Sequence, residues 1–217
     1  MRLARTLIVL VLGIGAASCA RDTFTEMVHV PQIEGYETRL AEFRDRRDVY
    51  FSTDPESPLL PEERENFTGL DYFEPDPSLY FVGDLQIYVQ PETLQLVTTS
   101  GQARVAERVG FVAFRIDGRP LRLQVYRLAD GTGGLFLPFQ DATTGIDTYP
   151  AGRYLNLIPS AASGPYELDF NRAYNPSCAY GGAERFACPV TPLENHLDAR
   201  IAAGERGRHE VSRQEGG

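Results

Sequence analysis

The sequence predicts an all-β fold, a mainly antiparallel meander that is barrel- or sandwich-like, with a helix before the sheet and a short C-terminal helix. The main observation is an alternation of apolar and polar residues with a period of two, the pattern of half-buried strands. This alternation occupies residues 79–89, 94–98, 112–116, 121–125 and 135–139. A second observation is the Asp117-Gly118 pair between two of these segments, a strong signal for a two-residue hairpin turn.

The element before the sheet is predicted from a different spacing. Tyr36, Leu40, Phe43 and Tyr50 are separated by charged residues and recur at intervals close to whole helical turns. This spacing places them on one face of a helix. We therefore expect a helix before the first long strand. A short second helix is expected to open at Pro61, because a proline in the first turn loses no needed hydrogen-bond donor.

The sheet is expected to contain about seven or eight strands. Pro91-Glu92 is predicted to form a turn between two of them, and the last two strands are expected at residues 153–157 and 166–170. The glycine-rich residues 130–134 are predicted to connect two strands. They do not form a phosphate-binding loop, because no helix start and no Lys-Ser/Thr pair follows them. No cofactor is expected.

The C-terminal part is predicted to be a long ordered loop, because Pro, Gly and Asn are frequent between residues 171 and 197. Loops of this length inside a compact domain usually have a function. A short helix over residues 192–203 is expected to pack Leu197 and Ile201 against the sheet.

The first residues have the composition of a bacterial signal peptide. Two arginines precede an apolar run over residues 7–14, and small residues then lead to Cys19. The run is too short for a membrane-spanning helix. A cysteine after small residues indicates a lipobox, in which the Cys19 thiol is acylated and becomes the mature N-terminus. Secretory cleavage after Ala20 is the alternative, because Ala16 occupies the position where a lipobox usually has Leu.

The chain is expected to contain one folded domain, since about 200 residues with 42% hydrophobic content can bury one core. The predicted segments are a signal peptide at 1–18, a tether at 19–34, a single β-rich domain at 35–205 and a disordered tail at 206–217. The lipidated protein is expected at the periplasmic face of the outer membrane or elsewhere in the cell envelope. A soluble periplasmic or secreted protein is the alternative.

The charge of the chain argues against nucleic acid as a partner. Residues 1–18 contain two arginines and no acidic residue, so their removal changes the formal charge from −9 to −11. An acidic surface repels the phosphate backbone.

Polar residues that could form a binding site are concentrated in residues 139–195. The ligand-binding candidates are Asp141, Tyr149, Arg153, Asp169, Asn171, Asn175, Glu194 and Asn195. The Arg153 guanidinium could bind a carboxylate or phosphate group of a ligand. It could instead form a buried pair with Asp141 or Asp169 that holds the strands and a turn in place. The sequence leaves both interpretations open.

Catalysis by these residues is a weaker hypothesis. Acid/base hydrolysis needs two carboxylates that converge on one bond, and the sequence supplies acids without showing convergence. A Ser/His/Asp triad is not indicated, because no G-x-S-x-G elbow is present. Cys178, His196 and Asn175 could form a Cys/His/Asn set, but nothing else supports it. No metal site is expected, since the cysteines have neither a second Cys pair nor a His pair nearby.

Cys178 and Cys188 are ten positions apart and are the two cysteines that remain besides Cys19. In an exported protein such a pair is expected to form a disulfide. Free thiols are the alternative.

Three segments resemble a known family. F-x-D-A-T-x-G-x-x-T-Y-x-A-G-R-Y begins at Phe139, D-F-N-x-A-Y-N-P-x-C-A begins at Asp169, and C-P-x-x-P-x-E-N-x-L begins at Cys188. In this order they resemble the bacterial domain of unknown function 1684 family, and the resemblance extends over about residues 40–205. The family has no established activity, so the resemblance implies neither a substrate nor a catalytic residue.

The sequence therefore predicts an exported, lipid-anchored envelope protein that binds a small or polymeric polar ligand, such as a cell-wall fragment, through residues 139–195. Its other expected partner is the membrane, through the lipid anchor. Two alternatives remain. One is a hydrolase that uses Asp and Glu residues of the same region. The other is a structural or assembly component without a small-molecule site.

Overall fold

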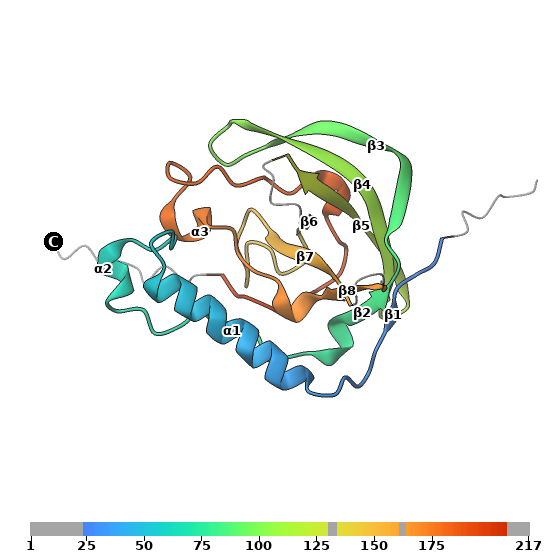
Figure 1. Cartoon of the computed structure of the whole chain (residues 1–217), viewed down its shortest axis with the longest axis horizontal. Helices are drawn as coiled ribbons and strands as arrows, with labels where there is room; N and C mark the ends of the chain where they lie inside the picture. The colour runs from blue at the N-terminus through green and yellow to red at the C-terminus, as the bar shows by residue number, and fades with distance from the viewer. Residues whose placement is uncertain (1–23, 130–133, 161–163, 208–217) are drawn as a thin grey trace, which may run out of the picture.

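The computed structural model describes residues 24–129, 134–160 and 164–207. Within them, eight strands form one antiparallel sheet that curls into a half-barrel (Figure 1). In order across the sheet the strands are β1 (Val28–His29), β2 (Tyr80–Gly83), β8 (Tyr166–Asp169), β7 (Arg153–Pro159), β6 (Leu135–Phe139), β5 (Arg119–Leu128), β4 (Ala103–Ile116) and β3 (Gln86–Val97). The predicted all-β, antiparallel fold is confirmed, in its barrel-like form.

The predicted hairpin at Asp117-Gly118 joins β4 to β5. Both turn residues have positive φ, 50° at Asp117 and 74° at Gly118. Asp and Gly adopt this conformation more readily than other residues, and its twist matches that of the flanking strands. The pairing of Ile116 with Arg119 follows from the two-residue loop.

The predicted turn at Pro91-Glu92 is wrong. β3 runs through Pro91 without reversing, and its pairing with β4 shifts register between Ile87 and Glu92. β3 is one of the two edge strands of the sheet, so the missing N–H of Pro91 can face away from β4 at an irregularity and cost no ladder bond.

The main core fills the inner side of the curled sheet. It is built from apolar side chains that alternate along the strands, joined by residues from the C-terminal segment. Its fully buried members include Val112, Phe114, Leu123, Val125, Leu137, Phe139, Phe170 and Ile201. Burial of each large apolar side chain contributes about 1.5 to 3 kcal/mol.

The helix predicted before the sheet is α1 (Tyr36–Thr53), which lies alongside the sheet (Figure 1). Tyr36 and Leu40 are buried against Tyr80 of β2. The prediction for Tyr50 is wrong, because its side chain is 37% exposed and Phe51 is buried instead. Phe51 follows Leu40 by eleven residues, three helical turns, and therefore shares its face.

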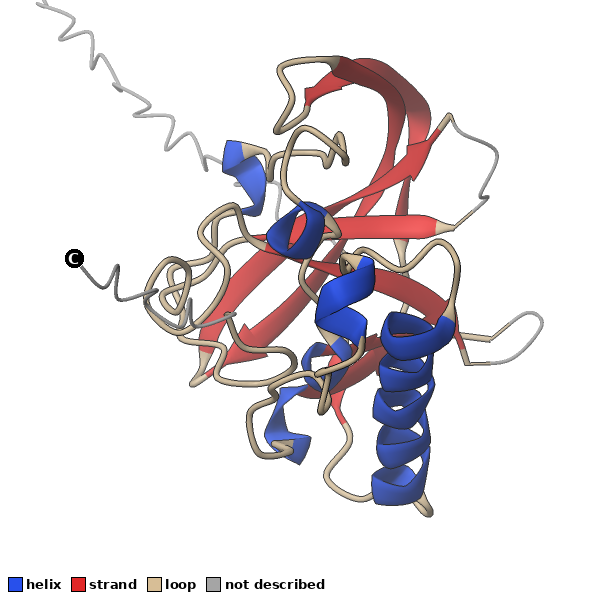
Figure 2. Cartoon of the chain, turned by 90° about the vertical axis from the view of Figure 1, so that its left-hand side faces the viewer, coloured by secondary structure: helices blue, strands red, loops and turns tan. Residues whose placement is uncertain are grey.

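The other helices are short. They are α2 (Pro61–Arg64), α3 (Cys178–Gly181) and the 3-10 turns η1 (Pro77–Leu79), η2 (Phe170–Arg172) and η3 (Leu193–Asn195). Long loops connect them on the side of the molecule that faces the viewer in Figure 2. The predicted C-terminal helix over residues 192–203 is limited to η3, because the backbone that follows makes hydrogen bonds to the sheet and its loops instead.

The ordered domain is longer than predicted at both ends. Residues 24–34 were expected in the tether, but Met27 is buried and its N–H donates to the Ala113 carbonyl on β4. Arg206 and Gly207 were expected in the tail, and their N–H groups donate to Asp71 and Asp147 carbonyls. Among the described residues, no helix is both long and apolar enough to cross a membrane. Cys19 and the signal peptide lie outside the described residues.

Candidate functional site

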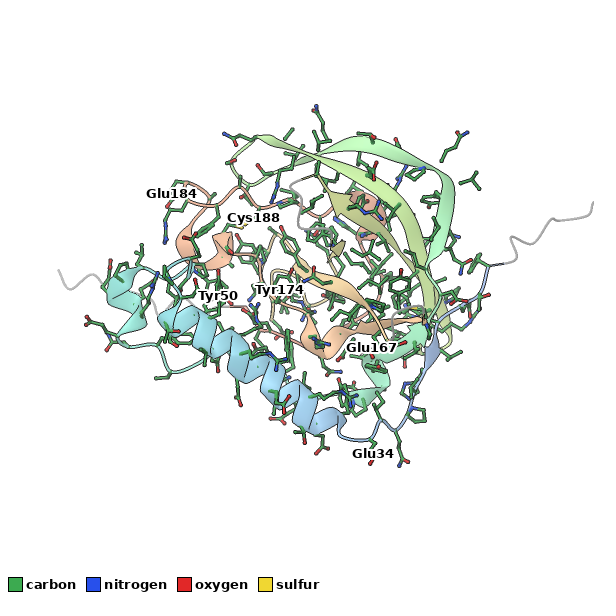
Figure 3. All side chains as sticks on the ribbon, viewed as in Figure 1. Glu34, Tyr50, Glu167, Tyr174, Glu184 and Cys188 are labelled. Atoms are coloured by element: carbon green, nitrogen blue, oxygen red, sulfur yellow. The ribbon has the colours of Figure 1, made fainter. Side chains whose placement is uncertain are left out.

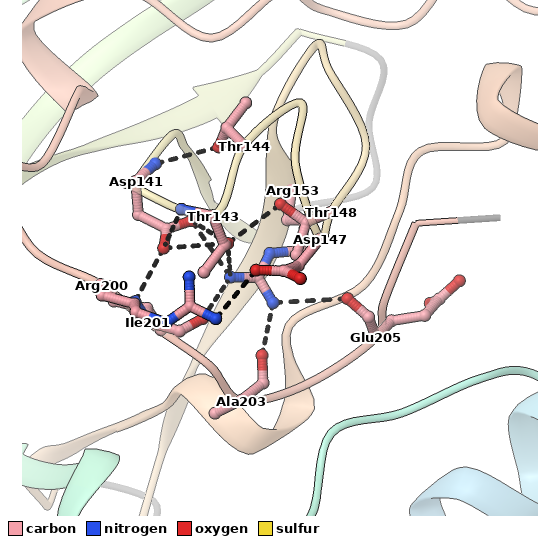
Figure 4. A network of polar contacts seen from close by, with 10 residues as sticks. All are labelled: Asp141, Thr143, Thr144, Asp147, Thr148, Arg153, Arg200, Ile201, Ala203 and Glu205. Atoms are coloured by element: carbon pink, nitrogen blue, oxygen red, sulfur yellow. Dashed lines mark hydrogen bonds and ion pairs between the residues drawn. The ribbon is translucent and has the colours of Figure 1, made fainter. Parts of the chain in front are cut away.

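Arg153 points from β7 to the C-terminal segment of the chain (Figure 4). Its guanidinium donates hydrogen bonds to the carbonyls of Ile201 at 2.8 Å, Ala203, and Glu205 at 3.3 Å, and it forms an ion pair of 3.2 Å with Asp141. The Arg153 and Asp141 side chains are 1% and 0% exposed. Arg153 therefore holds the C-terminal segment on the sheet.

Asp141 begins the turn after β6, and its own hydrogen bonds brace that turn. The carboxylate accepts from the Thr143 N–H at 3.1 Å, from the Thr143 hydroxyl at 2.9 Å, and from the Ile201 N–H at 2.7 Å. Both oxygens are thus occupied. Of the two sequence interpretations of Arg153, the buried structural pair is correct, and its partner is Asp141.

Two asparagines fasten loops to the sheet in the same way. The Asn195 side chain accepts from the Gln124 N–H at 2.7 Å and donates to the Gln124 carbonyl at 3.0 Å and the Pro138 carbonyl at 2.7 Å. The Asn171 side chain accepts from the Asp76 N–H at 2.7 Å and donates to the Asp76 carbonyl at 2.8 Å. These amides replace strand hydrogen bonds for segments that have no strand partner.

Asn175 is also internal, and it belongs to the surroundings of Glu205. Its N–H and side-chain amide donate to the two Glu205 carboxylate oxygens at 3.2 and 3.1 Å. Glu205 is fully buried and also pairs with Arg47 of α1 at 2.9 Å. Burial raises the pKa of Glu205 to about 7, although the Arg47 charge and the bonds from Asn175 lower it.

Tyr149 and Glu194 lie elsewhere. Glu194 is partly exposed and accepts from the Tyr126 hydroxyl at 2.9 Å and from Arg108 at 3.2 Å. The Tyr149 hydroxyl donates to the Cys178 sulfur at 3.8 Å. The eight predicted binding residues are therefore not brought together in one pocket.

Cys178 and Cys188 are buried and free, so the predicted disulfide is not found. The two residues are neighbours nonetheless, because the Cys178 N–H donates to the Cys188 sulfur at 3.1 Å. A hydrogen bond between the thiols lowers the pKa of Cys178 to about 6 and raises that of Cys188. Among the described residues, no group of three or more His, Cys, Asp and Glu side chains is placed to hold a metal ion.

A groove runs between α1 and the sheet, and we call it the α1 groove. It consists of two cavities of about 130 and 80 Å³ that share Glu167, Asp169 and Arg172 as lining residues. The first cavity is also lined by Tyr36, Arg39, Leu40, Glu42, Arg46 and Tyr80, and the second by Phe43, Leu155, Asn156, Ile158 and Tyr174. Glu167 and Tyr174 lie between α1 and the sheet in Figure 3.

Asp169 is the one predicted binding residue that lines this groove. It is 5% exposed, and its Oδ1 accepts from the Tyr36 hydroxyl at 2.9 Å and from the Asn171 N–H and side-chain amide at 3.0 and 3.2 Å. Within the described part of the chain, no group donates a hydrogen bond to Oδ2. Burial raises the pKa of Asp169 by more than the three hydrogen bonds lower it.

Arg172 adds a positive charge to the shared wall of the groove. Its guanidinium lies 4.7 Å from the Phe43 ring centre, and its charge favours the ionised form of Asp169. Glu167 is also on this wall, and burial together with the nearby Glu167 carboxylate raises the pKa of Tyr80. The α1 groove therefore combines an unoccupied carboxylate oxygen with guanidinium donors.

Four groove residues were not predicted as site residues from the sequence: Glu167, Arg172, Tyr36 and Tyr80. Glu167 and Asp169 are two positions apart on β8, so they share one face of the strand. This spacing was a usable signal for Glu167. Nothing in the sequence indicates Tyr36, because α1 docks against β8 from a position 133 residues earlier in the chain.

A larger cavity, of about 550 Å³, lies between residues 66–71 and the last described residues, Arg206 and Gly207. Its acidic residues Glu62 and Asp71 are exposed. The α1 groove is the stronger candidate, because a buried carboxylate faces it.

The chain is similar to proteins without an assigned activity. A solution NMR structure of an uncharacterized protein from Haloarcula marismortui, gene locus rrnAC0354, is 39% identical over 82% of this chain and 97% of that one, with a TM-score of 0.64. No curated protein matches the chain. The model of the family described as protein of unknown function, DUF1684, matches residues 65–206, including Asp141, Arg153 and Asp169. The chain therefore belongs to the DUF1684 family.

Proposed function

We propose that the protein binds a small polar ligand in the α1 groove, with Asp169 and Arg172 as the principal contacts. The observation that supports this proposal is the Asp169 carboxylate: it is buried, three hydrogen bonds hold one oxygen, and the other oxygen receives none from the described residues. Oδ2 is not one of the fully buried side-chain atoms that lack a partner, so it is accessible from the groove. A ligand donor at Oδ2 would form a charge-assisted hydrogen bond there.

The surroundings of Asp169 hold its side chain in one orientation before a ligand arrives. Tyr36 comes from α1 and Asn171 from η2, so two different elements fix the carboxylate. A contact that is already oriented loses little conformational entropy on binding. The groove would therefore select a ligand with a donor at one defined position.

The test is a thermal-shift screen of the full chain against cell-wall fragments, sugars, organic acids and nucleotides, because a ligand that binds only the folded state raises the melting temperature. Compounds that raise it are then titrated against Asp169→Asn and Arg172→Gln by calorimetry. Each variant should weaken binding by about ten-fold or more, the range for a hydrogen bond to a charged group.

The matched control for this screen is Asp147→Asn. Asp147 pairs with Arg200 at 2.8 Å on the surface and does not line the α1 groove. Its substitution should leave every affinity unchanged. Ligands whose affinity is unaffected by both groove variants would show that the site lies elsewhere.

A hydrolase is the second candidate, because two carboxylates line the same groove. Glu167 and Asp169 share a face of β8 and differ in environment: Asp169 is buried with a raised pKa, and Glu167 is half-buried. Acid/base pairs in enzymes show this kind of difference. Hydrolysis of nitrophenyl esters, glycosides or phosphates that is abolished by both Glu167→Gln and Asp169→Asn would support it. Equal rates in wild type and variants would exclude it.

We also propose that the protein is exported and anchored through a lipid on Cys19. The support is the signal-peptide composition before Cys19. Because Phe24 is the fifth residue after Cys19, the anchored domain would begin within about 18 Å of the lipid. Mass spectrometry of membrane-extracted protein should find diacylglyceryl on Cys19. A soluble mature chain that begins at Arg21 would contradict the anchor.

A further inference from the structure

We infer that the ligand of the α1 groove is a short hydroxycarboxylic acid, whose carboxylate binds the groove arginines and whose hydroxyl donates to Asp169 Oδ2. This inference rests on the proposed function and narrows it to one chemical class. Three features of the groove support it: two guanidinium groups without a carboxylate partner among the described residues, the position of the free acceptor and the volume.

The first feature is the charge balance of the larger cavity. Its lining contains three arginines and three acidic residues, Arg39, Arg46 and Arg172 against Glu42, Glu167 and Asp169. One of the acids has an ionic partner here, since Glu42 pairs with Arg46 at 3.8 Å. For Arg39 and Arg172, no described carboxylate lies within ion-pair distance.

The unpaired guanidiniums indicate an acidic ligand group. Arg39 uses one nitrogen to donate to the Glu34 carbonyl at 2.7 Å, and Arg172 is held over the Phe43 ring. Each guanidinium retains N–H groups to which the described residues supply no acceptor, and both residues line the larger cavity. Arginine binds a carboxylate through two parallel hydrogen bonds, so a carboxylate is the ligand group that fits these donors.

The second feature is the acceptor. Asp169 ends β8 and Arg172 ends η2, and both line both cavities, so the acceptor and the cation lie on the same short stretch of wall. A ligand that reaches both must carry a hydrogen-bond donor close to its carboxylate. A hydroxyl suits Asp169 in either protonation state, whereas an ammonium group would require the ionised form, which burial disfavours.

The third feature is size. The two cavities have volumes of about 130 and 80 Å³. An apolar protein cavity of about 150 Å³ accommodates benzene, which has six non-hydrogen atoms. The groove thus accommodates about six to ten such atoms, as in lactate, glycerate or malate. Nucleotides and disaccharides are too large to enter completely.

Calorimetry with four matched compounds tests the inference on the full chain. Glycerate has both groups, propionate lacks the hydroxyls, propane-1,2-diol lacks the carboxylate, and serine has an ammonium in place of the 2-hydroxyl. Glycerate should bind at least about ten-fold more tightly than each of the other compounds, which is the effect of one hydrogen bond to a charged group.

Variants assign each half of the ligand. Asp169→Asn should lower the ratio of glycerate affinity to propionate affinity, because a neutral amide is a weaker hydrogen-bond acceptor than a carboxylate. Arg172→Gln should weaken both acids by the same factor. Tyr36→Phe removes a bond to Asp169 Oδ1 and should lower glycerate affinity by a smaller factor. Far-UV circular dichroism of each variant establishes that it folds.

Two results would overturn the inference, and they have different meanings. If compounds of another class bind and the groove variants weaken them, the ligand class is wrong and the proposed function stands. If neither groove variant changes the affinity for glycerate or for any compound found in the wider screen, the proposed function fails as well. Tighter binding of serine than of glycerate would identify an amino acid as the ligand instead.

Discussion

Arg153 of β7 and Asp141 of the turn after β6 form an ion pair of 3.2 Å in which neither side chain is more than 1% exposed. Two unpaired charges at this depth would be very costly. The pair also fixes the C-terminal segment, because Asp141 accepts a hydrogen bond from the Ile201 N–H and Arg153 donates one to the Ile201 carbonyl. The C-terminal segment is thereby attached to the sheet from both sides of one residue.

Arg153→Ala is expected to destabilise the domain by about 3 to 5 kcal/mol, because it leaves the Asp141 carboxylate buried without its cation. It also leaves the carbonyls of Ile201 and Ala203 without donors. Urea denaturation gives the difference directly. Arg200→Ala is the control, because its pair with Asp147, at 2.8 Å, is largely exposed. This second change should cost less than about 1 kcal/mol. Equal losses in the two variants would show that the buried pair has no special role.

The stability of the domain is expected to depend on pH through Glu205. Burial raises the pKa of this carboxyl to about 7, from 4.5, so the folded state binds a proton that the unfolded state releases. The contribution to stability is full below about pH 4.5 and is lost as the pH rises through 7, for a change of about 3 kcal/mol.

Glu205→Gln isolates this effect, because glutamine cannot titrate. The variant loses an amount of stability that does not depend on pH, because Arg47 is left without its ionic partner. Relative to wild type, however, its melting temperature should rise between pH 5 and pH 8. Parallel pH profiles for the two proteins would mean that Glu205 keeps one protonation state over this range.

Gly152→Ala is expected to cost about 2 to 5 kcal/mol. Gly152 has φ of 96°, and an added Cβ would lie 2.5 Å from the Thr191 hydroxyl oxygen and 2.6 Å from the Phe139 carbonyl oxygen. Gly101→Ala is the matched control, with φ of 80° and nothing within 4 Å of the added atom. It should cost only the backbone strain, about 1 to 2 kcal/mol. Thermal unfolding of both variants measures the difference, which would vanish if the loop around Gly152 can move.

Asn195→Leu is expected to destabilise by more than about 2 kcal/mol, because it removes the partners of the Gln124 N–H and the Gln124 and Pro138 carbonyls. Asn156→Leu is the comparison, since the exposed Asn156 side chain bonds, among the residues that the structure describes, only to the Tyr174 hydroxyl, at 3.3 and 3.5 Å. Its cost should stay within about 0.5 kcal/mol. Chemical denaturation tests both, and a small effect at Asn195 would show that water replaces its amide.

The sheet could be predicted because its signals are local. Period-two alternation and the Asp117-Gly118 turn act on neighbouring residues, and the chain adopts the same geometry wherever they occur. Pro91 was misread because its effect depends on position in the sheet. A proline breaks a central strand but is tolerated in an edge strand such as β3, and strand order is not visible in the sequence.

The predicted C-terminal helix failed for a tertiary reason. Residues 192–203 have helical spacing, yet the Ile201 N–H and the Ile201 and Ala203 carbonyls bond to Asp141 and Arg153. These buried, charge-assisted bonds are stronger than the helical bonds that the segment could form in water.

The sequence alone determined the fold class, the family and the polar residues of residues 139–195, because each of these follows from residue types and their spacing. The tertiary structure decided what those polar residues do. Arg153, Asn171, Asn175 and Asn195 turn inward and hold loops, whereas Asp169 faces a groove whose second wall is α1. That wall comes from a distant part of the chain, so the groove exists only after α1 packs on β2 and β8 and buries Tyr36 beside Asp169.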